Sequence, residues 1–172
     1  MRVSFFSLVM ALVLIFGCEN STKTKETNQN KTTNIKPITF SLAEEEELKK
    51  LDSLNLDSSY ANLLSPAYNS EENIKEVRRS WSKLHQDLGK YLVEQNFNWG
   101  INDSSISLFN KIYFSEDGTI DYYAFKVITP SVSDDKVDEF ELLLKEFSSE
   151  VKLDLNQKKN FAQCGKSRIM NN

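Results

Sequence analysis

The stretch SISLFNKIYFSEDGTIDYYAFKVI, residues 105–128, contains two runs in which apolar side chains alternate with other side chains. This period of two is typical of β-strands, because successive side chains of a strand point to opposite faces of a sheet. Between the runs lies Asp117-Gly118, a dipeptide that favours the tight turn of a β-hairpin. The centre of the chain is therefore predicted to form two antiparallel strands joined at Gly118.

The register of this hairpin predicts how its side chains divide between two faces. A three-residue turn with Gly118 in the left-handed conformation places Phe114 opposite Ile120 and Ile112 opposite Tyr122. One face then carries the strongest apolar residues. The other face is predicted to be mixed and partly open, and it consists of Phe109, Lys111, Tyr113, Asp121, Tyr123, Phe125 and Val127.

Helical periodicity surrounds the hairpin. Residues 70–94 and residues 133–151 carry apolar side chains at steps of three and four, and each stretch starts with a serine followed by acidic residues. Upstream, Ser41-Leu42-Ala43-Glu44 is a capping-box pattern that predicts a first helix. The tail, residues 161–169, is a possible third strand. This order predicts an α+β domain in which a small antiparallel sheet, the hairpin plus the possible third strand, packs with two or three helices.

Residues 104–170 also resemble the C-terminal domain of TonB-like energy-transducing proteins. The resemblance rests on the turn Glu116-Asp117-Gly118-Thr119-Ile120-Asp121-Tyr122 and on the order of a hairpin, a helix and a closing strand. The chain lacks the Tyr-Pro element expected before that hairpin and the Pro-rich segment that spans the periplasm. No functional residue is assigned from this resemblance.

The beginning of the chain has the pattern of a secretory signal peptide, with Arg2 followed by an apolar stretch that ends at Phe16. That stretch is shorter than the roughly 20 residues that a membrane-spanning helix needs. Ile15-Phe16-Gly17-Cys18 resembles the lipobox of bacterial lipoproteins. The resemblance implies cleavage before Cys18, a thioether-linked diacylglycerol on its sulfur and acylation of its new amino group. The alternatives are an ordinary cleaved signal with Cys18 nearby and an uncleaved anchor.

The chain is accordingly expected to have three parts: a signal peptide at residues 1–17, a lipidated cysteine with a flexible tether at 18–37, and a single α+β domain at 38–172. The tether is polar, so it cannot bury enough apolar surface to offset the entropy of ordering it. Glu19 after the cysteine is typical of lipoproteins sent to an outer membrane. We expect an exported protein of the cell envelope, held at a membrane by its lipid, and favour the outer membrane over the inner.

Composition excludes several classes of partner and cofactor. The formal net charge of −4 at pH 7 and the absence of a basic stripe argue against binding nucleic acid. A zinc site needs three or four convergent Cys, His or acidic ligands, and once Cys18 is lipidated only one histidine and one free thiol remain, which argues against such a site. The isolated glycines form no phosphate-binding loop. We therefore expect no metal and no cofactor.

Three functions remain open. The first is a non-catalytic envelope lipoprotein, an accessory or immunity-type protein, that binds another protein through Trp99, Phe109, Lys111, Tyr113, Tyr123 and Phe125. The second is a small thiol enzyme or hydrolase that uses Cys164 as nucleophile and His85 as base. The third is a module that binds cell-wall sugars through Trp99 and the tyrosines. Aromatic core packing, a packed thiol and a structural histidine are the corresponding structural explanations.

Overall fold

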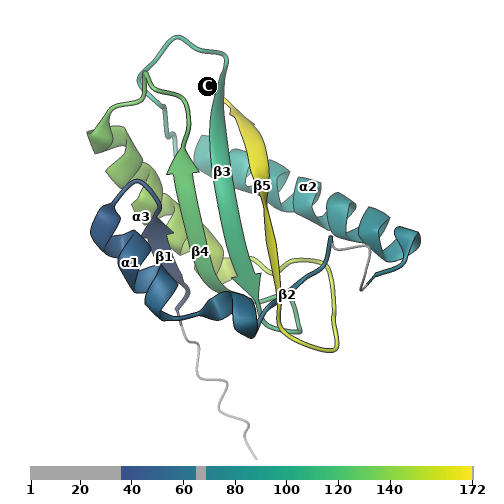
Figure 1. The fold of residues 1–172 in the computed structure, drawn as a ribbon. Helices are drawn as coiled ribbons and strands as arrows, with labels where there is room; N and C mark the ends of the chain where they lie inside the picture. Colours follow the sequence, from purple (N-terminus) through teal and green to yellow (C-terminus); the bar gives the residue numbers. More distant parts are fainter. Residues whose placement is uncertain (1–35, 65–68, 172) are drawn as a thin grey trace, which may run out of the picture. The chain divides into compact units, whose positions relative to one another are not determined.

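A computed structural model describes residues 36–64 and 69–171 of the chain (Figure 1). The elements are β1 (Ile38–Ser41), α1 (Glu45–Ser53), the 3-10 helix η1 (Leu56–Ser58), β2 (Ala61–Asn62), α2 (Glu71–Glu94), β3 (Ser105–Phe114), β4 (Ile120–Val127), α3 (Asp134–Glu150) and β5 (Phe161–Met170). Within these residues the strands form one five-stranded sheet in the order β1-β4-β3-β5-β2. Both the leader and most of the predicted tether lie outside the described residues.

The fold class is α+β, as the sequence predicts, but the sheet is mixed and larger than expected. β3 is the central strand, and it pairs antiparallel with both β4 and β5. The possible third strand is thus confirmed, and it lies beside the first strand of the hairpin. β1 and β2 extend the sheet at its two edges by parallel pairing with β4 and β5. They escaped prediction because four and two residues are too short to show a period.

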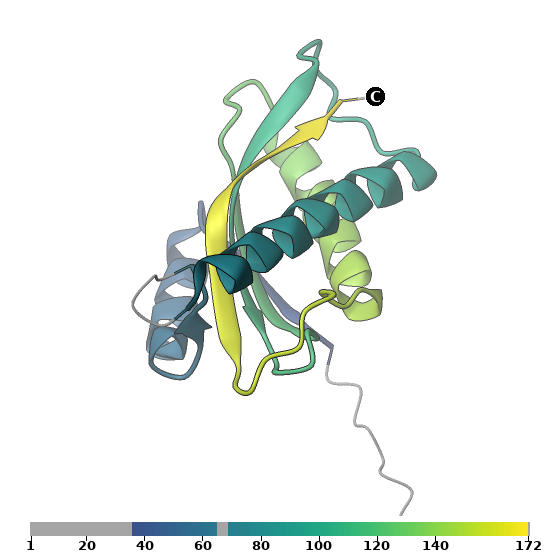
Figure 2. The ribbon, with the colours of Figure 1, turned by 90° about the vertical axis from the view of Figure 1, so that its right-hand side faces the viewer.

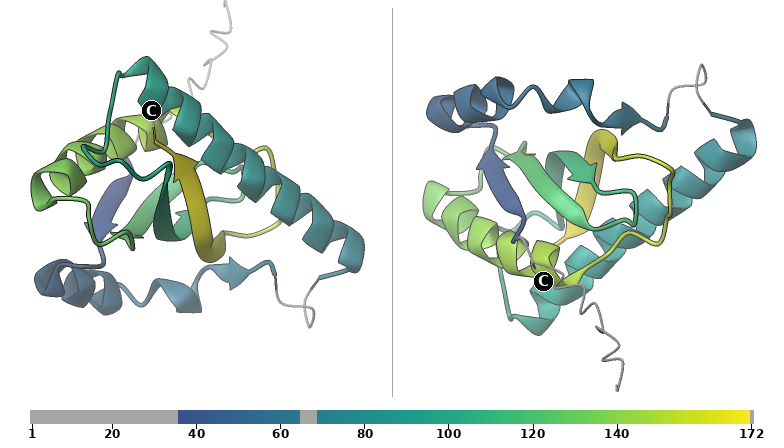
Figure 3. Two further views of the ribbon diagram at one scale, coloured as in Figure 1. Left: turned by 90° about the horizontal axis from the view of Figure 1, so that it is seen from above. Right: turned by 90° about the horizontal axis from the view of Figure 1, so that it is seen from below.

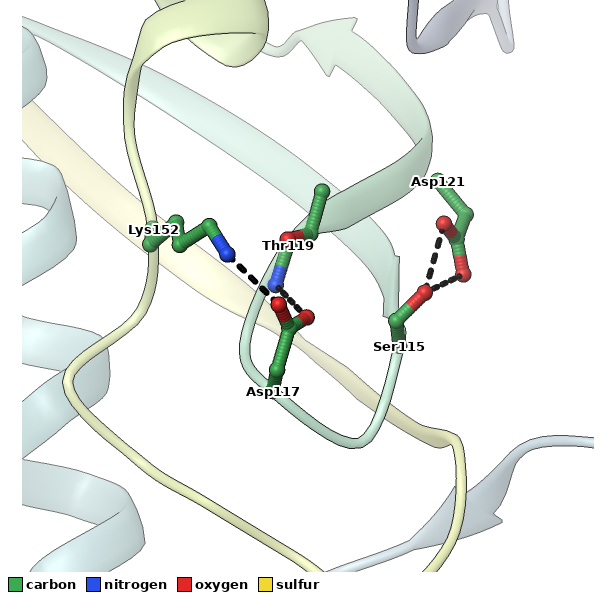
Figure 4. Close-up of polar contacts among 5 residues, drawn as sticks. All are labelled: Ser115, Asp117, Thr119, Asp121 and Lys152. Carbon is green, nitrogen blue, oxygen red and sulfur yellow. Dashed lines mark hydrogen bonds and ion pairs between the residues drawn. The ribbon is translucent and has the colours of Figure 1, made fainter. Parts of the chain in front are cut away.

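The turn of the hairpin matches the prediction. Gly118 has a φ of 82°, and Phe114 pairs with Ile120. Figure 4 shows how side chains close this turn. The Asp117 carboxylate accepts a hydrogen bond from the Thr119 amide at 3.1 Å and pairs with the Lys152 ammonium. The Ser115 hydroxyl lies 2.8 Å from both carboxylate oxygens of Asp121.

Beyond the turn, the predicted register is wrong by one residue. The pairing shifts between Phe114 and Tyr113, so that Tyr113 lies opposite Tyr122 and Asp121 is the extra residue of a β-bulge. A slip of one residue moves every following side chain to the other face of the sheet. Tyr123, Phe125 and Val127 therefore lie on the face of Ile112 and Leu108, not on the predicted mixed face.

Helices cover the two faces of the sheet unequally, as Figures 2 and 3 show. α2 and α3 pack on one face and bury the larger core, which includes Leu88, Phe140 and Leu144. The segment from α1 to β2 packs on the other face over a smaller cluster around Phe40 and Leu51. Because this segment covers less of the sheet than the two long helices, part of the second face stays accessible to solvent around Phe109.

The two longer helices have the predicted bounds, and the first does not. At the start of α2 the Ser70 hydroxyl accepts a hydrogen bond from the Asn73 amide at 3.2 Å, which satisfies one free N–H of the first turn. The capping-box pattern instead ends a strand: Ser41 belongs to β1, and its amide donates to Glu47. Within α1, Leu51 is the buried residue. In the described residues, no helix combines the length and the apolar character required to span a membrane.

Candidate functional site

The six residues of the predicted binding surface do not share one surface. Trp99, Tyr123 and Phe125 are buried in the larger core, where the Trp99 and Phe125 rings lie 4.8 and 5.4 Å from the ring of Phe140. Tyr113 is buried in the smaller cluster on the other face. Only Phe109 and Lys111 keep partial exposure. The Lys111 ammonium pairs with Asp57 at 2.7 Å, and that hydrogen bond lowers the pKa of the Asp57 carboxyl.

Cys164 and His85 are not brought together. Cys164 lies opposite Lys111 on the face that α1 partly covers, and it is exposed, not packed as the structural explanation supposed. His85 is buried on α2, on the opposite face of the sheet. Its two ring nitrogens already have partners: Nδ1 lies 2.9 Å from the Trp81 carbonyl, and Nε2 lies 3.1 Å from the side-chain nitrogen of Asn110.

The histidine instead belongs to a buried polar network. Because the Trp81 carbonyl can only accept, His85 carries its proton on Nδ1, and Nε2 accepts from Asn110. Asn110 also donates to the Ser167 hydroxyl at 2.8 Å and accepts from the Tyr123 hydroxyl at 3.1 Å. Burial lowers the pKa of His85, which keeps the ring neutral. These bonds position α2 against β3 and β5.

The acidic residues near the hairpin turn have structural roles. The hydrogen bond from Lys152, together with bonds from Thr119, lowers the pKa of Asp117 to about 2. Asp121 accepts from the hydroxyls of Ser115 and Tyr60. The two carboxylates lie apart on opposite sides of the turn, each with its own partners, and are not arranged as an acid–base pair (Figure 4). Among the residues that the structure describes, no group of three His, Cys, Asp or Glu side chains is placed to hold a metal ion.

The candidate site is a groove between β5 and α2, the helix that crosses β5 in Figures 1 and 2. The groove has a volume of about 540 Å³. Its lining from α2 includes Trp81, Gly89 and Val93, and its lining from β5 extends from Lys166 to Met170. Gly89 leaves room in the groove, because a Cβ there would meet only Ile169 as a near neighbour, at an ordinary contact distance of 3.8 Å.

The edge of β5 along this groove has free backbone groups. The backbone N–H of Asn171, just beyond the end of β5, donates to the Ser104 carbonyl at 3.0 Å. Because backbone groups alternate in direction along a strand, the odd-numbered residues of β5 direct their N–H and C=O toward β3. In an antiparallel pair the next residue directs both its N–H and its C=O away from that neighbour. β2 pairs with this outer edge only at Phe161 and Ala162. Beyond them, no strand in the described part of the chain pairs with the outward groups of Cys164, Lys166, Arg168 and Met170.

Charge distinguishes the groove from the rest of this acidic protein. Three cationic residues line it, Lys90, Lys166 and Arg168, and its lining contains no carboxylate. Lys90 lies 3.8 Å from Asp87 on its own helix. Within the described residues, Lys166 and Arg168 have no acidic partner. The groove therefore presents positive charge next to apolar surface and free hydrogen-bonding groups.

A second hollow, of about 680 Å³, lies on the other face between η1 and β5 and includes Cys164, Lys111 and Lys159. Two of its charged residues, Asp57 and Lys111, are paired with each other, and Asp57 also accepts from the nearby Tyr113 hydroxyl at 3.1 Å. Among the residues that the structure describes, β2 already pairs with the outer edge of β5 at Phe161 and Ala162, so only Cys164 has an unpaired outward edge beside this hollow. We therefore take the α2–β5 groove as the candidate site.

Comparison with known proteins finds no matching family model, no matching curated protein and no matching solved structure. The site is consequently argued from geometry alone. Sequence reasoning missed it because it depends on which strand β5 joins and on where α2 crosses. One signal was present: Lys166, Arg168 and Met170 alternate with Gly165, Ser167 and Ile169, a strand pattern with one cationic side.

Proposed function

We propose that this chain is a lipid-anchored protein of the cell envelope, without catalytic activity of its own, that binds an extended segment of another protein in the α2–β5 groove. The single observation that carries the binding mode is the free edge of β5 beside that groove. An extended peptide that joins such an edge gains main-chain hydrogen bonds, while the neighbouring helix supplies contacts for its side chains. This mode needs neither a metal nor a nucleophile.

The length of the edge suits a short segment. Residues 164–170 present four residues with outward backbone groups, and at about 3.3 Å per residue they span roughly 20 Å. The added strand would convert the outer edge of β5 into an interior position of the sheet. Anchoring through Cys18 supports the same role, because a tethered binding domain meets its partner at the membrane surface. The envelope location rests on the lipobox and signal-peptide patterns.

Amide hydrogen exchange tests the strand addition at single residues. The probe is an eight-residue peptide of alternating valine and threonine, added to the full chain in detergent. We expect the amides of Lys166, Arg168 and Met170 to become protected, while those of Ser167 and Ile169, already bonded to β3, change little. A peptide whose amide nitrogens are methylated along the edge that bonds to β5 should no longer protect these amides. A peptide methylated along its opposite edge should still protect them.

A variant that fills the groove provides the second arm. Gly89→Leu places a side chain against Ile169 in the groove, and the helix accepts leucine readily. The matched control is Lys75→Leu, which adds the same side chain at an exposed position of α2 outside the groove. Gly89→Leu should abolish protection by the peptide and Lys75→Leu should not. Equal protection in both variants, or none in the unmodified protein, would refute binding in this groove.

A further inference from the structure

We infer that the segment bound in the α2–β5 groove alternates apolar and acidic residues, with the apolar row toward α2 and the acidic row beside Lys166 and Arg168. This inference rests on the proposed strand addition and specifies the chemistry of the partner. Its basis is that the two sides of β5 differ at this edge: the side under α2 is mainly apolar, and the other is cationic.

The row that faces α2 meets apolar surface. An added strand continues the pleat of β5, so alternate side chains lie beside Gly165, Ser167 and Ile169. The Trp81 ring covers Gly165, where a Cβ would lie 3.9 Å from the ring atoms. Gly89 and Val93 border this side farther along, together with the polar side chains of Gln86 and Lys90. Apolar side chains of moderate size therefore fit this row.

The opposite row meets positive charge. Lys166 and Arg168 point to the outer face, because they pair with Phe109 and Ser107 and not with the core-facing residues of β3. Lys126 of β4 pairs with the other side of Phe109, so a cation flanks this ring on each neighbouring strand. In the part of the chain that the structure describes, none of these three cations has an acidic partner. Carboxylates in the outward row of the ligand would lie beside Lys166 and Arg168 and supply their missing partners, whereas Lys126 lies on β4, beyond β3.

The same charges disfavour the two occupants that this chain could provide. Two copies of the chain could pair antiparallel through their β5 edges over residues 164–170. Lys166 of each copy would then lie opposite Arg168 of the other. Like charges directly opposite each other destabilise a strand pair. The segment 19–35 carries three lysines and two glutamates and lacks a repeated alternation of apolar residues, so it does not match either row. The occupant is therefore a segment of a different protein.

Three synthetic octapeptides test the inference: alternating valine–glutamate, valine–lysine and valine–threonine, each titrated calorimetrically into the full chain in detergent. Cross-strand pairs of opposite charge each contribute about 0.2–1 kcal/mol, so two pairs should favour the glutamate peptide over the threonine peptide by about two- to thirty-fold in affinity. The lysine peptide should bind most weakly. The advantage of the glutamate peptide should diminish as salt is raised.

Charge variants assign the preference to the proposed residues. The double variant Lys166→Gln with Arg168→Gln should bind the glutamate and threonine peptides equally. The control, Lys158→Gln with Lys159→Gln, removes the same charge from two exposed residues outside the groove and should retain the preference. Equal binding of the glutamate and threonine peptides by the unmodified protein would overturn the inference and leave strand addition standing. Failure of all three peptides to bind would overturn both.

Discussion

The hairpin turn offers the sharpest quantitative prediction, through the substitution Gly118→Ala. Gly118 has a φ of 82°, a region in which a residue with a side chain costs roughly 1–2 kcal/mol. In addition, a Cβ at this position would lie 2.2 Å from the Leu153 carbonyl oxygen and 3.2 Å from that of Leu155. The backbone of Leu153 must therefore move, although its amide donates to the Gly118 carbonyl at 2.9 Å.

The magnitude follows by adding two contributions. Forcing an extra methyl group into a packed site costs about 1–3 kcal/mol, so the total destabilisation is about 2–5 kcal/mol. For a domain of this size, each kcal/mol lowers the melting temperature by roughly 3–4 °C, so Gly118→Ala should lower it by on the order of 10 °C. Thermal unfolding followed by circular dichroism measures this shift directly.

Gly100→Ala is the matched control. Gly100 also has a positive φ, of 72°, but a Cβ there would meet only side-chain carbons of Lys136, at 3.7 and 3.8 Å. It isolates the backbone cost of roughly 1–2 kcal/mol without the clash. If the two variants lose the same stability, the close approach of Leu153 to the turn is not part of the folded state, and the reasoning fails.

Three other substitutions test separate parts of the interpretation. Cys18→Ser should release the protein from membranes into the soluble fraction, and a variant that stays in the membrane pellet would contradict the lipid anchor. Burial lowers the pKa of His85 below 6.5, so the neutral ring should contribute fully to stability above about pH 6.5, and this contribution should decline as the pH falls further. The free energy of unfolding of His85→Gln, measured in urea, should not show that decline. Cys164→Ser should leave peptide binding unchanged and stability within about 0.5 kcal/mol, because the thiol is exposed, and a loss of biological activity would restore the thiol-enzyme hypothesis.

The features predicted correctly from the sequence are those fixed by local interactions. Gly118 closes its turn through its own backbone conformation, and Ser70 starts α2 through a bond to an amide three residues away. The capping pattern at Ser41 failed because a longer-range interaction won: pairing of Ser41 with Phe125 places it in β1. The glutamate of that pattern still precedes the helix, as its N-terminal flanking residue.

The binding surface was predicted wrongly for a related reason. The assignment of Tyr123 and Phe125 to an open face assumed an unbroken register, and the bulge at Asp121 moves both into the core. The bulged Asp121 also has a partner outside the hairpin: it accepts from Tyr60, a residue that precedes it by 61 positions. A pattern within residues 105–128 contains no information about that contact.

The two edges of the sheet then suggest why binding is expected at β5. β1 pairs with four of the eight residues of β4, whereas β2 pairs with only two of the ten residues of β5. A long free edge is a template for association with other chains, and natural proteins protect such edges with charged side chains. Lys166 and Arg168 provide that protection against a second copy of this chain, because identical edges repel. The same two cations attract an acidic strand, so the protection of the edge and its selectivity for a partner have a common physical origin.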